Sequence, residues 1–331
     1  MILSYLAAYV LALLLALYGT PIARKAAIRF GVVDNPDGRL KNHRAPVPYL
    51  GGLAIYLAVL IPLCLFYTFD TRILSILLAG TLVLMLGLID DFGVLTPAAK
   101  MIGQLLAVFV LIKGDVFIRI GSFPPTVNLI LTVLWLLGMA NALNIIDIMD
   151  GLAAGIALCS SVCLFVVAIL NGHSMIAIFT ISLVGSLAGF IPYNFKPAKI
   201  YMGDTGSMFL GLTLGALSII GDYSQFNKLA FFNPLIIFGV AIFDTFFVMV
   251  LRVSKRRSPF LGSPDHFAIR LKRKGWSVKK IVLASYAIAT ILGSLAIWNM
   301  YLPEQRSLAL YSGILLFFLL LGIGLSRIKV A

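Results

Sequence analysis

The sequence is poor in charged residues and in cysteine. Of its 331 residues only 12% are charged and 61% are hydrophobic, whereas a soluble domain has about 25% charged and about 45–50% apolar residues. The chain therefore has too few polar side chains to cover a surface in water. Its three cysteines, Cys64, Cys159 and Cys163, lie inside apolar segments, which argues against a disulfide framework and a cysteine metal site.

The uncharged parts of the sequence are long apolar segments. A membrane-spanning helix needs about 20 apolar residues, fewer if it is short or broken. The candidate spans are 2–22, 49–68, 73–90, 99–113, 126–143, 152–170, 174–191, 206–220, 229–251, 280–299 and 307–326. The first has no basic leader and no cleavage site, so we expect it to span the membrane. We predict an all-α polytopic membrane bundle of about 11 transmembrane helices, or 10 by a stricter count, in which residues 1–331 form a single integral membrane domain.

The basic residues lie mostly on one side of this bundle. A net charge of +13 can indicate nucleic-acid binding, but in a membrane protein Lys and Arg gather in cytoplasmic loops. If alternate loops share a side, one side receives the loops near 24–48, 91–98, 144–151, 192–205 and 252–279 with the C-terminal tail. With Lys100 and Lys280 at its edges, this side carries 21 of the 26 basic residues. We therefore predict that these loops are cytoplasmic, that the N-terminus faces out, and that the chain contacts membrane lipids and no nucleic acid.

Acidic residues gather on the same side, which insertion into a membrane does not explain. A carboxylate at a membrane edge is costly unless a metal or another cation accompanies it. Eight aspartates share this side: Asp34, Asp37, Asp90, Asp91, Asp147, Asp150, Asp204 and Asp265. Their grouping is the first indication of a functional site.

Asp90 and Asp91 close one apolar segment. Adjacent carboxylates repel each other, so at least one must be paired, protonated or bound to a metal. Mg²⁺ prefers few carboxylates together with phosphate oxygens and water, which suits such a pair. The alternative is a polar helix end beside a turn at Gly93 and Pro97.

Four polar residues, Asn141, Asn144, Asp147 and Asp150, recur at every third position. In a helix they would form one polar stripe on an apolar segment. Such a stripe inside a membrane needs a polar ligand or a water-filled cavity. Hydrogen bonding between helices is the alternative, but it explains two carboxylates poorly, so we favour a functional role.

Asp204 is flanked by glycines at the start of another apolar segment. Glycine lets the backbone approach a ligand closely, and a helix N-terminus favours phosphate. Lys196 and Lys199 supply nearby cations, and the ring of Phe195 or Tyr201 is available to stack on a base. The alternative, an ordinary helix N-cap, explains Asp204 alone.

The remaining candidates lie in basic loops or deep in a span. The loop 252–280 has ten Lys or Arg residues around His266, which can shuttle a proton or hold a phosphate; binding of lipid head groups is the alternative for the cations. Lys41 and Arg44 lie in a proline-punctuated loop that can contact phosphate. Asp244 lies inside a span, where it is either functional or paired with a hydroxyl of a neighbouring helix.

Clustered acids, a phosphate-binding helix start and basic loops together indicate Mg²⁺-assisted phosphoryl transfer at the membrane surface. An ion-coupled secondary transporter is the main rival, and it predicts inverted repeats and acids at the bilayer midplane. The sequence shows no such repeat, and the candidate acids sit at one face except Asp244, which lies deep in a span. A lipid-binding scaffold, a further rival, would not need five clustered acids.

Three strings resemble one membrane enzyme family in their order along the chain: Leu-Gly-Leu-Ile-Asp90-Asp91, Asn141-Ala-Leu-Asn144-Ile-Ile-Asp147-Ile-Met-Asp150 and Tyr201-Met-Gly-Asp204-Thr-Gly-Ser. They resemble the polyprenyl-phosphate N-acetylhexosamine-1-phosphate transferases, and the resemblance extends over residues 34–280. It implies that undecaprenyl phosphate attacks the β-phosphate of a UDP-N-acetylhexosamine. The products would be a lipid-linked sugar diphosphate for cell-envelope polysaccharides and UMP.

The resemblance also implies roles for individual side chains. It implies catalytic roles for Asp90, Asp91, Asp147, Asp150 and His266. It implies substrate contacts for Lys41, Arg44, Asn144, Asn194 and Tyr201. It implies a Mg²⁺ site, with Mn²⁺ as the alternative metal, at Asp204 and Asp150.

The chain departs from the family pattern at two places. Ile148 and Met149 stand where the family usually has Gly-Leu, and the His-rich cytoplasmic motif is reduced to His266. The spacing of Asp90–Lys100 resembles the N-acetylglucosamine branch, whereas the surroundings of Trp276 resemble the phospho-N-acetylmuramoyl-pentapeptide branch. We expect UDP-N-acetylglucosamine as donor, with the muramoyl-pentapeptide donor as the alternative. The resemblance implies an active site on the cytoplasmic face of a bacterial inner membrane, in a chain that acts alone or as a homodimer.

Overall fold

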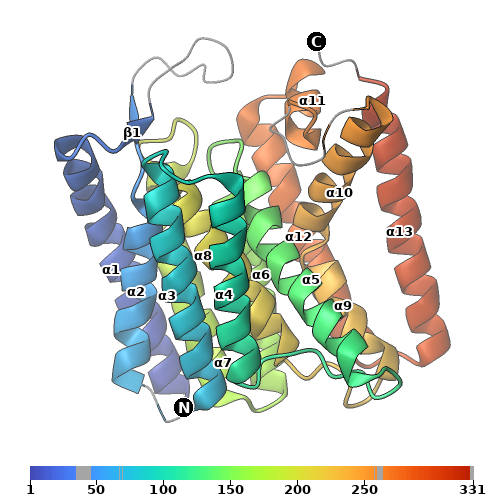
Figure 1. Ribbon diagram of the computed structural model, residues 1–331. Helices are drawn as coiled ribbons and strands as arrows, with labels where there is room; N and C mark the ends of the chain where they lie inside the picture. Colours follow the sequence, from blue (N-terminus) through green and yellow to red (C-terminus); the bar gives the residue numbers. More distant parts are fainter. Residues whose placement is uncertain (35–45, 67, 69, 257, 259–263, 329–331) are drawn as a thin grey trace. The chain divides into compact units, whose positions relative to one another are not determined.

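The computed structural model describes residues 1–34, 46–66, 68, 70–256, 258 and 264–328. The described residues are mostly helical (Figure 1), which confirms the predicted all-α membrane bundle. They divide into two compact units, Met1–Gly221 and Asp222–Ala331. We call these unit 1 and unit 2. Lys41 and Arg44, two predicted substrate contacts, lie outside the described residues.

Unit 1 has a two-stranded antiparallel sheet and a set of long helices. The strands are β1 (Val33–Asp34) and β2 (Val47–Pro48), with Val33 opposite Pro48. The helices are α1 (Ile2–Arg29), α2 (Gly51–Phe66), α3 (Thr71–Asp91), α4 (Pro97–Lys113), α5 (Pro125–Ile145), α6 (Leu152–Leu170), α7 (Ser174–Asn194) and α8 (Gly203–Ile219). Each predicted span of this unit corresponds to one helix, although α2, α4 and α8 have only 16, 17 and 17 residues.

Unit 2 is also helical. Its elements are the 3₁₀ helix η1 (Lys228–Phe232) and the α-helices α9 (Asn233–Ile237), α10 (Gly239–Ser254), α11 (Phe267–Arg273), α12 (Val278–Asn299) and α13 (Glu304–Ser326). The predicted span 229–251 is broken here by a 70° bend between Lys228–Ile237 and Gly239–Ser254. Buried amides stabilise the chain before the bend: Asn233 Nδ2 donates to the carbonyl of Ala296 and Asn299 Nδ2 donates to Asn233 Oδ1, both at 2.8 Å.

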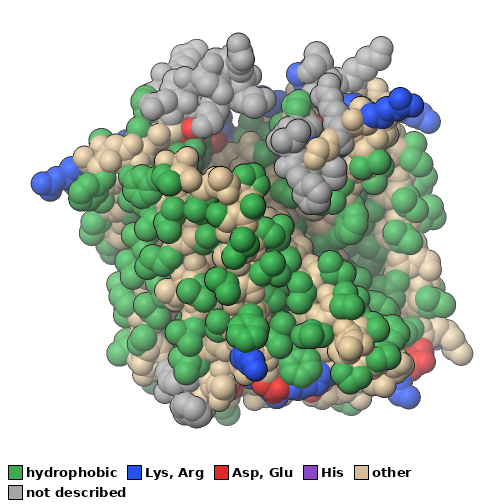
Figure 2. All heavy atoms as spheres, viewed as in Figure 1, with side chains coloured by type: hydrophobic (Ala, Val, Ile, Leu, Met, Phe, Trp, Pro, Cys, Tyr) green, Lys and Arg blue, Asp and Glu red, His purple; other side chains and the backbone are tan. Residues whose placement is uncertain are grey.

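Seven of the described helices are long and apolar enough to cross a membrane, or eight if the bent pair is one span. The predicted total of about 11 and the outward-facing N-terminus stay predictions. On the face shown in Figure 2, hydrophobic side chains cover the middle of the helices, and charged side chains lie near the helix ends. This distribution suits a lipid environment, where charges are tolerated near the interfaces.

Helix α8 is the buried centre of unit 1. Every residue from Thr205 to Ser218 is buried, because α2, α3, α5 and α6 pack against this helix. Two glycines allow the closest approaches: Gly52 lies against the backbone of Gly206, and a Cβ at Gly87 would meet the carbonyl oxygen of Asp204 at 2.5 Å. The first turn of α8 is therefore held by backbone packing on two sides.

Candidate active site

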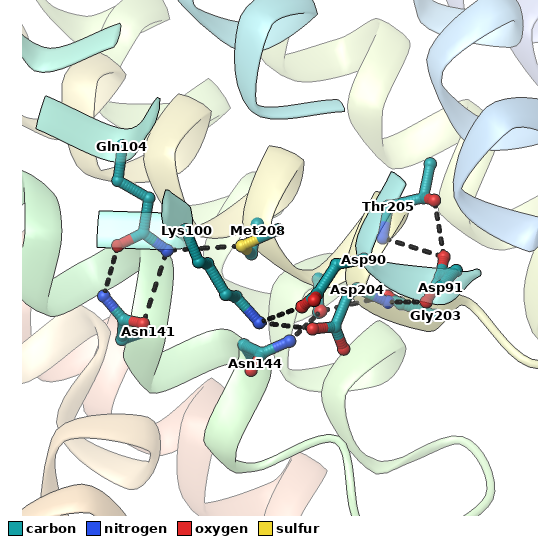
Figure 3. A network of polar contacts seen from close by, with 11 residues as sticks. Asp90, Asp91, Lys100, Gln104, Asn141, Asn144, Gly203, Asp204, Thr205 and Met208 are labelled. Atoms are coloured by element: carbon teal, nitrogen blue, oxygen red, sulfur yellow. Dashed lines mark hydrogen bonds and ion pairs between the residues drawn. The ribbon is translucent and has the colours of Figure 1, made fainter. Parts of the chain in front are cut away.

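The first turn of α8 is held by a carboxylate from the end of α3. Asp91 Oδ1 accepts a hydrogen bond from the backbone N–H of Asp204 at 2.8 Å, and its Oδ2 accepts from the N–H and the hydroxyl of Thr205 at 3.1 and 2.5 Å. The N-terminal N–H groups of a helix lack partners within the helix. Asp91 supplies those partners from another helix, so it orients Asp204 (Figure 3).

Asp90 faces a different partner. The Lys100 ammonium near the start of α4 donates to Asp90 Oδ2 at 2.7 Å and also to Asp204 Oδ2 (Figure 3). The side chains of Lys100 and Asp90 are only 20% and 18% exposed, so water screens the charges of the two carboxylates less than it would at an open surface. Lys100 therefore places one positive charge between two acids and reduces their mutual repulsion.

Asn144 completes the surroundings of Asp204 from α5. Its Nδ2 donates to Ser207 Oγ at 2.9 Å, and its amide also hydrogen-bonds to the Asp204 carboxylate. Ser207 Oγ donates in turn to the carbonyl of Gly203 at 3.0 Å. Asp204, which is 34% exposed, therefore receives one cation and one amide and still faces solvent.

The predicted polar stripe is divided by the end of α5. The helix ends at Ile145, so Asp147 and Asp150 lie in the turn before Gly151, whose φ of 80° starts α6. Burial, and then the charges of Asp204, Asp91 and Asp150, raise the pKa of Asp147 to about 8. Asp147 thus lies within electrostatic range of the acids on α3 and α8.

Asp150 holds the segment that follows α7. Its Oδ2 accepts from the N–H of Ala198 at 3.0 Å and from the Lys196 ammonium at 3.2 Å. Asn194 is 2% exposed and bridges two backbones: its Oδ1 accepts from Gly151 N–H, and its Nδ2 donates to the carbonyl of Ile200. The substrate roles of these side chains stay predictions, but their contacts build the loop that leads to Asp204.

A cleft of about 500 Å³ opens onto the acids of α3 and α8. Its lining consists of Val33, Asp34, Tyr49, Asp90, Asp91, Phe92, Gly93 and Asp204.

Burial, and then a hydrogen bond to Asp34, raise the pKa of Tyr49 well above its ordinary value. The ring of Tyr49 lies 6.1 Å from that of Tyr201, centre to centre. Burial and nearby carboxylates, Asp150 first, raise the pKa of Tyr201 to about 12, so both phenols stay protonated donors.

The donor set at Asp204 fits a divalent cation. The described residues contain no group of three or more His, Cys, Asp or Glu side chains arranged for a metal. Mg²⁺, however, is often held by one or two carboxylates together with water and phosphate oxygens. The position between Asp90 and Asp204 already holds a cationic group, the Lys100 ammonium. These oxygens suit Mg²⁺, whereas the contacts of Asp150 lie on the neighbouring loop.

Unit 2 contains the other predicted catalytic residue, His266. Its Nδ1 lies 2.7 Å from Asp244 Oδ2, and Asp244 Oδ1 accepts from the N–H of Phe267 at 3.0 Å. The partner of Asp244 is thus an imidazole, rather than the hydroxyl of a neighbouring helix. The adjacent Asp265 pairs with Arg270 at 2.6 Å and Lys255 at 2.7 Å, so two cations of the basic loop have acidic partners there.

Structure and prediction can be compared residue by residue. Unit 1 brings together eight predicted site residues: Asp90, Asp91, Asn144, Asp147, Asp150, Asn194, Tyr201 and Asp204. Sequence reasoning did not assign a role to Lys100 or Tyr49. A lone lysine ten residues after Asp90 was a weak signal, and nothing in the sequence pointed to Tyr49.

Known proteins similar to this chain include one family and several of its members. Residues 73–222 match the model of a family described as glycosyl transferase family 4. The chain is 35% identical to the "Probable undecaprenyl-phosphate N-acetylglucosaminyl 1-phosphate transferase" of Bacillus subtilis, over 88% of this chain and 86% of that protein. It is 33% identical to a decaprenyl-phosphate N-acetylglucosaminephosphotransferase of Mycolicibacterium smegmatis, over 83% of this chain and 77% of that protein. It is 30% identical to a phospho-N-acetylmuramoyl-pentapeptide-transferase of Halalkalibacterium halodurans, over 90% of this chain and 97% of that protein.

Proposed function

Since the chain belongs to glycosyl transferase family 4, among the polyprenyl-phosphate sugar-1-phosphate transferases, we propose that it transfers an N-acetylhexosamine 1-phosphate from a UDP-sugar to undecaprenyl phosphate. UDP-N-acetylglucosamine is the proposed donor, because two of the relatives described above are named for N-acetylglucosamine. UDP-N-acetylmuramoyl-pentapeptide is the second candidate, because another relative is named for that reaction.

The observation that carries the proposal is the Asp90–Lys100–Asp204 array beside the cleft. An oxygen of the lipid phosphate attacks the β-phosphorus of the UDP-sugar, and the bond from that phosphorus to the oxygen of UMP breaks. Negative charge then grows on the departing UMP. The Lys100 cation stabilises that charge.

The two adjacent acids have different proposed roles. All the described contacts of Asp91 go to the start of α8, so Asp91 is a positioning group. Asp90 has one described hydrogen-bond donor, Lys100, and is the better candidate to take a proton from the lipid phosphate. Asp204 would hold Mg²⁺, or Mn²⁺, which when bound would neutralise charge on the diphosphate.

We further propose that the enzyme acts at the cytoplasmic face of a bacterial inner membrane as one integral transferase domain. The basic loops and the position of a soluble UDP-sugar support this face. A homodimer stays a prediction, and the mass of the purified protein in detergent is its test.

The proposed reaction is tested with the purified full-length protein, undecaprenyl phosphate and Mg²⁺. UDP-N-acetylglucosamine, UDP-N-acetylgalactosamine and UDP-N-acetylmuramoyl-pentapeptide are supplied in parallel, and UMP is measured. We expect release from UDP-N-acetylglucosamine, its loss when EDTA is added, and its return with excess Mg²⁺. Release from the muramoyl-pentapeptide donor alone would replace the first candidate by the second, and no release from any donor would reject the transferase activity.

The packing of Gly87 predicts a sharp loss of activity on its replacement. Gly87→Ala would push a methyl group into the carbonyl of Asp204, and such overpacking costs about 1–3 kcal/mol. We expect slower UMP release and a lower melting temperature in detergent. Gly138→Ala is the matched control, because a Cβ there meets nothing within 4 Å. Equal activity of the two variants would contradict the proposed tight fit at Asp204.

A further inference from the structure

A second polar layer lies one helical turn from the Asp204 layer, on the same three helices (Figure 3). Each of its residues is three or four positions from a residue of the first layer: Gln104 from Lys100 on α4, Asn141 from Asn144 on α5, and Met208 from Asp204 on α8. Residues with this spacing lie on one face of a helix. Lys100, Asn144 and Asp204 therefore each have a residue of the second layer one turn away on the same helix face.

The centre of this layer is a reciprocal amide pair. Asn141 Nδ2 donates to Gln104 Oε1 at 2.9 Å, and Gln104 Nε2 donates to Asn141 Oδ1 at 3.3 Å. Asn141 Nδ2 also donates to the carbonyl of Leu137 at 2.8 Å, and Gln104 Nε2 lies 3.2 Å from the Met208 sulfur. Gln104 is fully buried, so loss of either amide leaves a buried polar group without its partner.

Gln104 also anchors the end of α4 that carries Lys100. The first turn of this helix is exposed at Pro97 and Ala98, and Gln104 is the first buried residue of α4. The loop between α4 and α5 lies at the other end of these helices. Near the site, the amide pair is thus the side-chain hydrogen bond that ties α4 to α5.

We propose that Gln104 and Asn141 are positioning residues, whose amide pair holds the Lys100 ammonium in line with Asp204 during phosphoryl transfer. This role rests on the proposed function. The pair touches neither the acids nor the cleft lining. It acts by fixing the start of α4 relative to α5, and so the direction from which the ammonium meets the carboxylates.

The test is a mutational cycle on the full-length protein with UMP release as the readout. Gln104→Met keeps the length of the side chain and removes its hydrogen bonds. We expect kcat to fall about tenfold while KM for the UDP-sugar changes less than about twofold, because an alignment in the transition state is lost rather than ground-state binding. In a Lys100→Met background, Gln104→Met should lower kcat hardly further, because the ammonium that Gln104 positions is already absent.

Two further variants separate positioning from general loosening. The exchanged pair Gln104→Asn with Asn141→Gln retains both amides and should recover at least half of the wild-type kcat. Asn128→Leu removes another buried amide from α5, one that bonds to the backbone of Ile120. This control should lower the melting temperature and leave kcat/KM for the UDP-sugar unchanged. If Gln104→Met does not fold, Asn141→Ala takes its place in the cycle.

The outcomes are distinguishable. Losses that multiply in the Lys100→Met background, or an Asn128→Leu variant with the same kinetic defect, would overturn the positioning role. Failure of the exchanged pair to recover activity would overturn it as well. A wild-type protein that releases no UMP from any donor would instead reject the proposed function on which this role rests.

Discussion

Asp204→Asn is expected to lower kcat for UMP release by about 10³-fold, the scale on which removal of a central electrostatic group acts. Asparagine keeps the shape of the side chain and an oxygen that can accept from Lys100. It loses the negative charge that pairs with the ammonium and that would hold Mg²⁺. UMP release at saturating donor, measured over a range of Mg²⁺ concentrations, is the test.

A matched substitution at the other end of the same unit is the control. Asp115 is 47% exposed and pairs at 3.0 Å with Arg72 at the start of α3, the end of that helix opposite Asp90 and Asp91. Surface ion pairs of this kind contribute about 0–1 kcal/mol, so Asp115→Asn should retain the wild-type rate. Asp204→Asn with more than about a tenth of wild-type kcat would contradict a central role for the carboxylate.

Hydropathy predicted the helical membrane bundle, and local motifs named most of the side chains that the structure groups in unit 1. Apolar runs mark each spanning helix because a bilayer demands about 20 apolar residues in sequence. Polar residues at the ends of such runs mark the site, because unpaired carboxylates are costly there. Both signals are local, and they singled out Asp90, Asp147 and Asp204, which the structure places within one unit; their roles stay predictions.

Contacts across helices could not be predicted in this way. Lys100 and Asp204 are separated by 104 positions, and periodicity tells which face of a helix is polar without telling which faces meet. The same limit hid the different partners of Asp90 and Asp91. It also left two partners open for Asp244, whose imidazole partner lies 22 positions later.

The broken span near Phe238 shows a further limit. Its hydropathy is that of one continuous span, whereas the structure bends by 70°, and Asn299 at the end of α12 hydrogen-bonds to Asn233 before the bend. Local propensity is a weak indicator where tertiary hydrogen bonds satisfy an interrupted backbone. A hydropathy profile therefore records the length of this segment and misses its shape.

Lys100→Met is expected to lower kcat/KM for UMP release about 10²-fold, on the scale of a lost charge-assisted contact in a partly buried site. Without the ammonium, the carboxylates of Asp90 and Asp204 face each other with no described cation between them. The departing UMP also loses a positive group near the start of α8. Lys100→Arg should restore the rate only in part, because a planar guanidinium cannot reproduce a compact charge between two acids.

The Mg²⁺ dependence of Lys100→Met distinguishes two roles of this lysine. If the ammonium takes part in transfer, excess Mg²⁺ should leave the variant slow. If it merely occupies a cation position while no metal is bound, its removal should free both carboxylates, so that the variant would need less Mg²⁺ and keep the wild-type maximal rate. We expect the first result, because Lys100 is partly buried and hydrogen-bonded to both acids. A wild-type maximal rate at lower Mg²⁺ would assign the position to the metal alone.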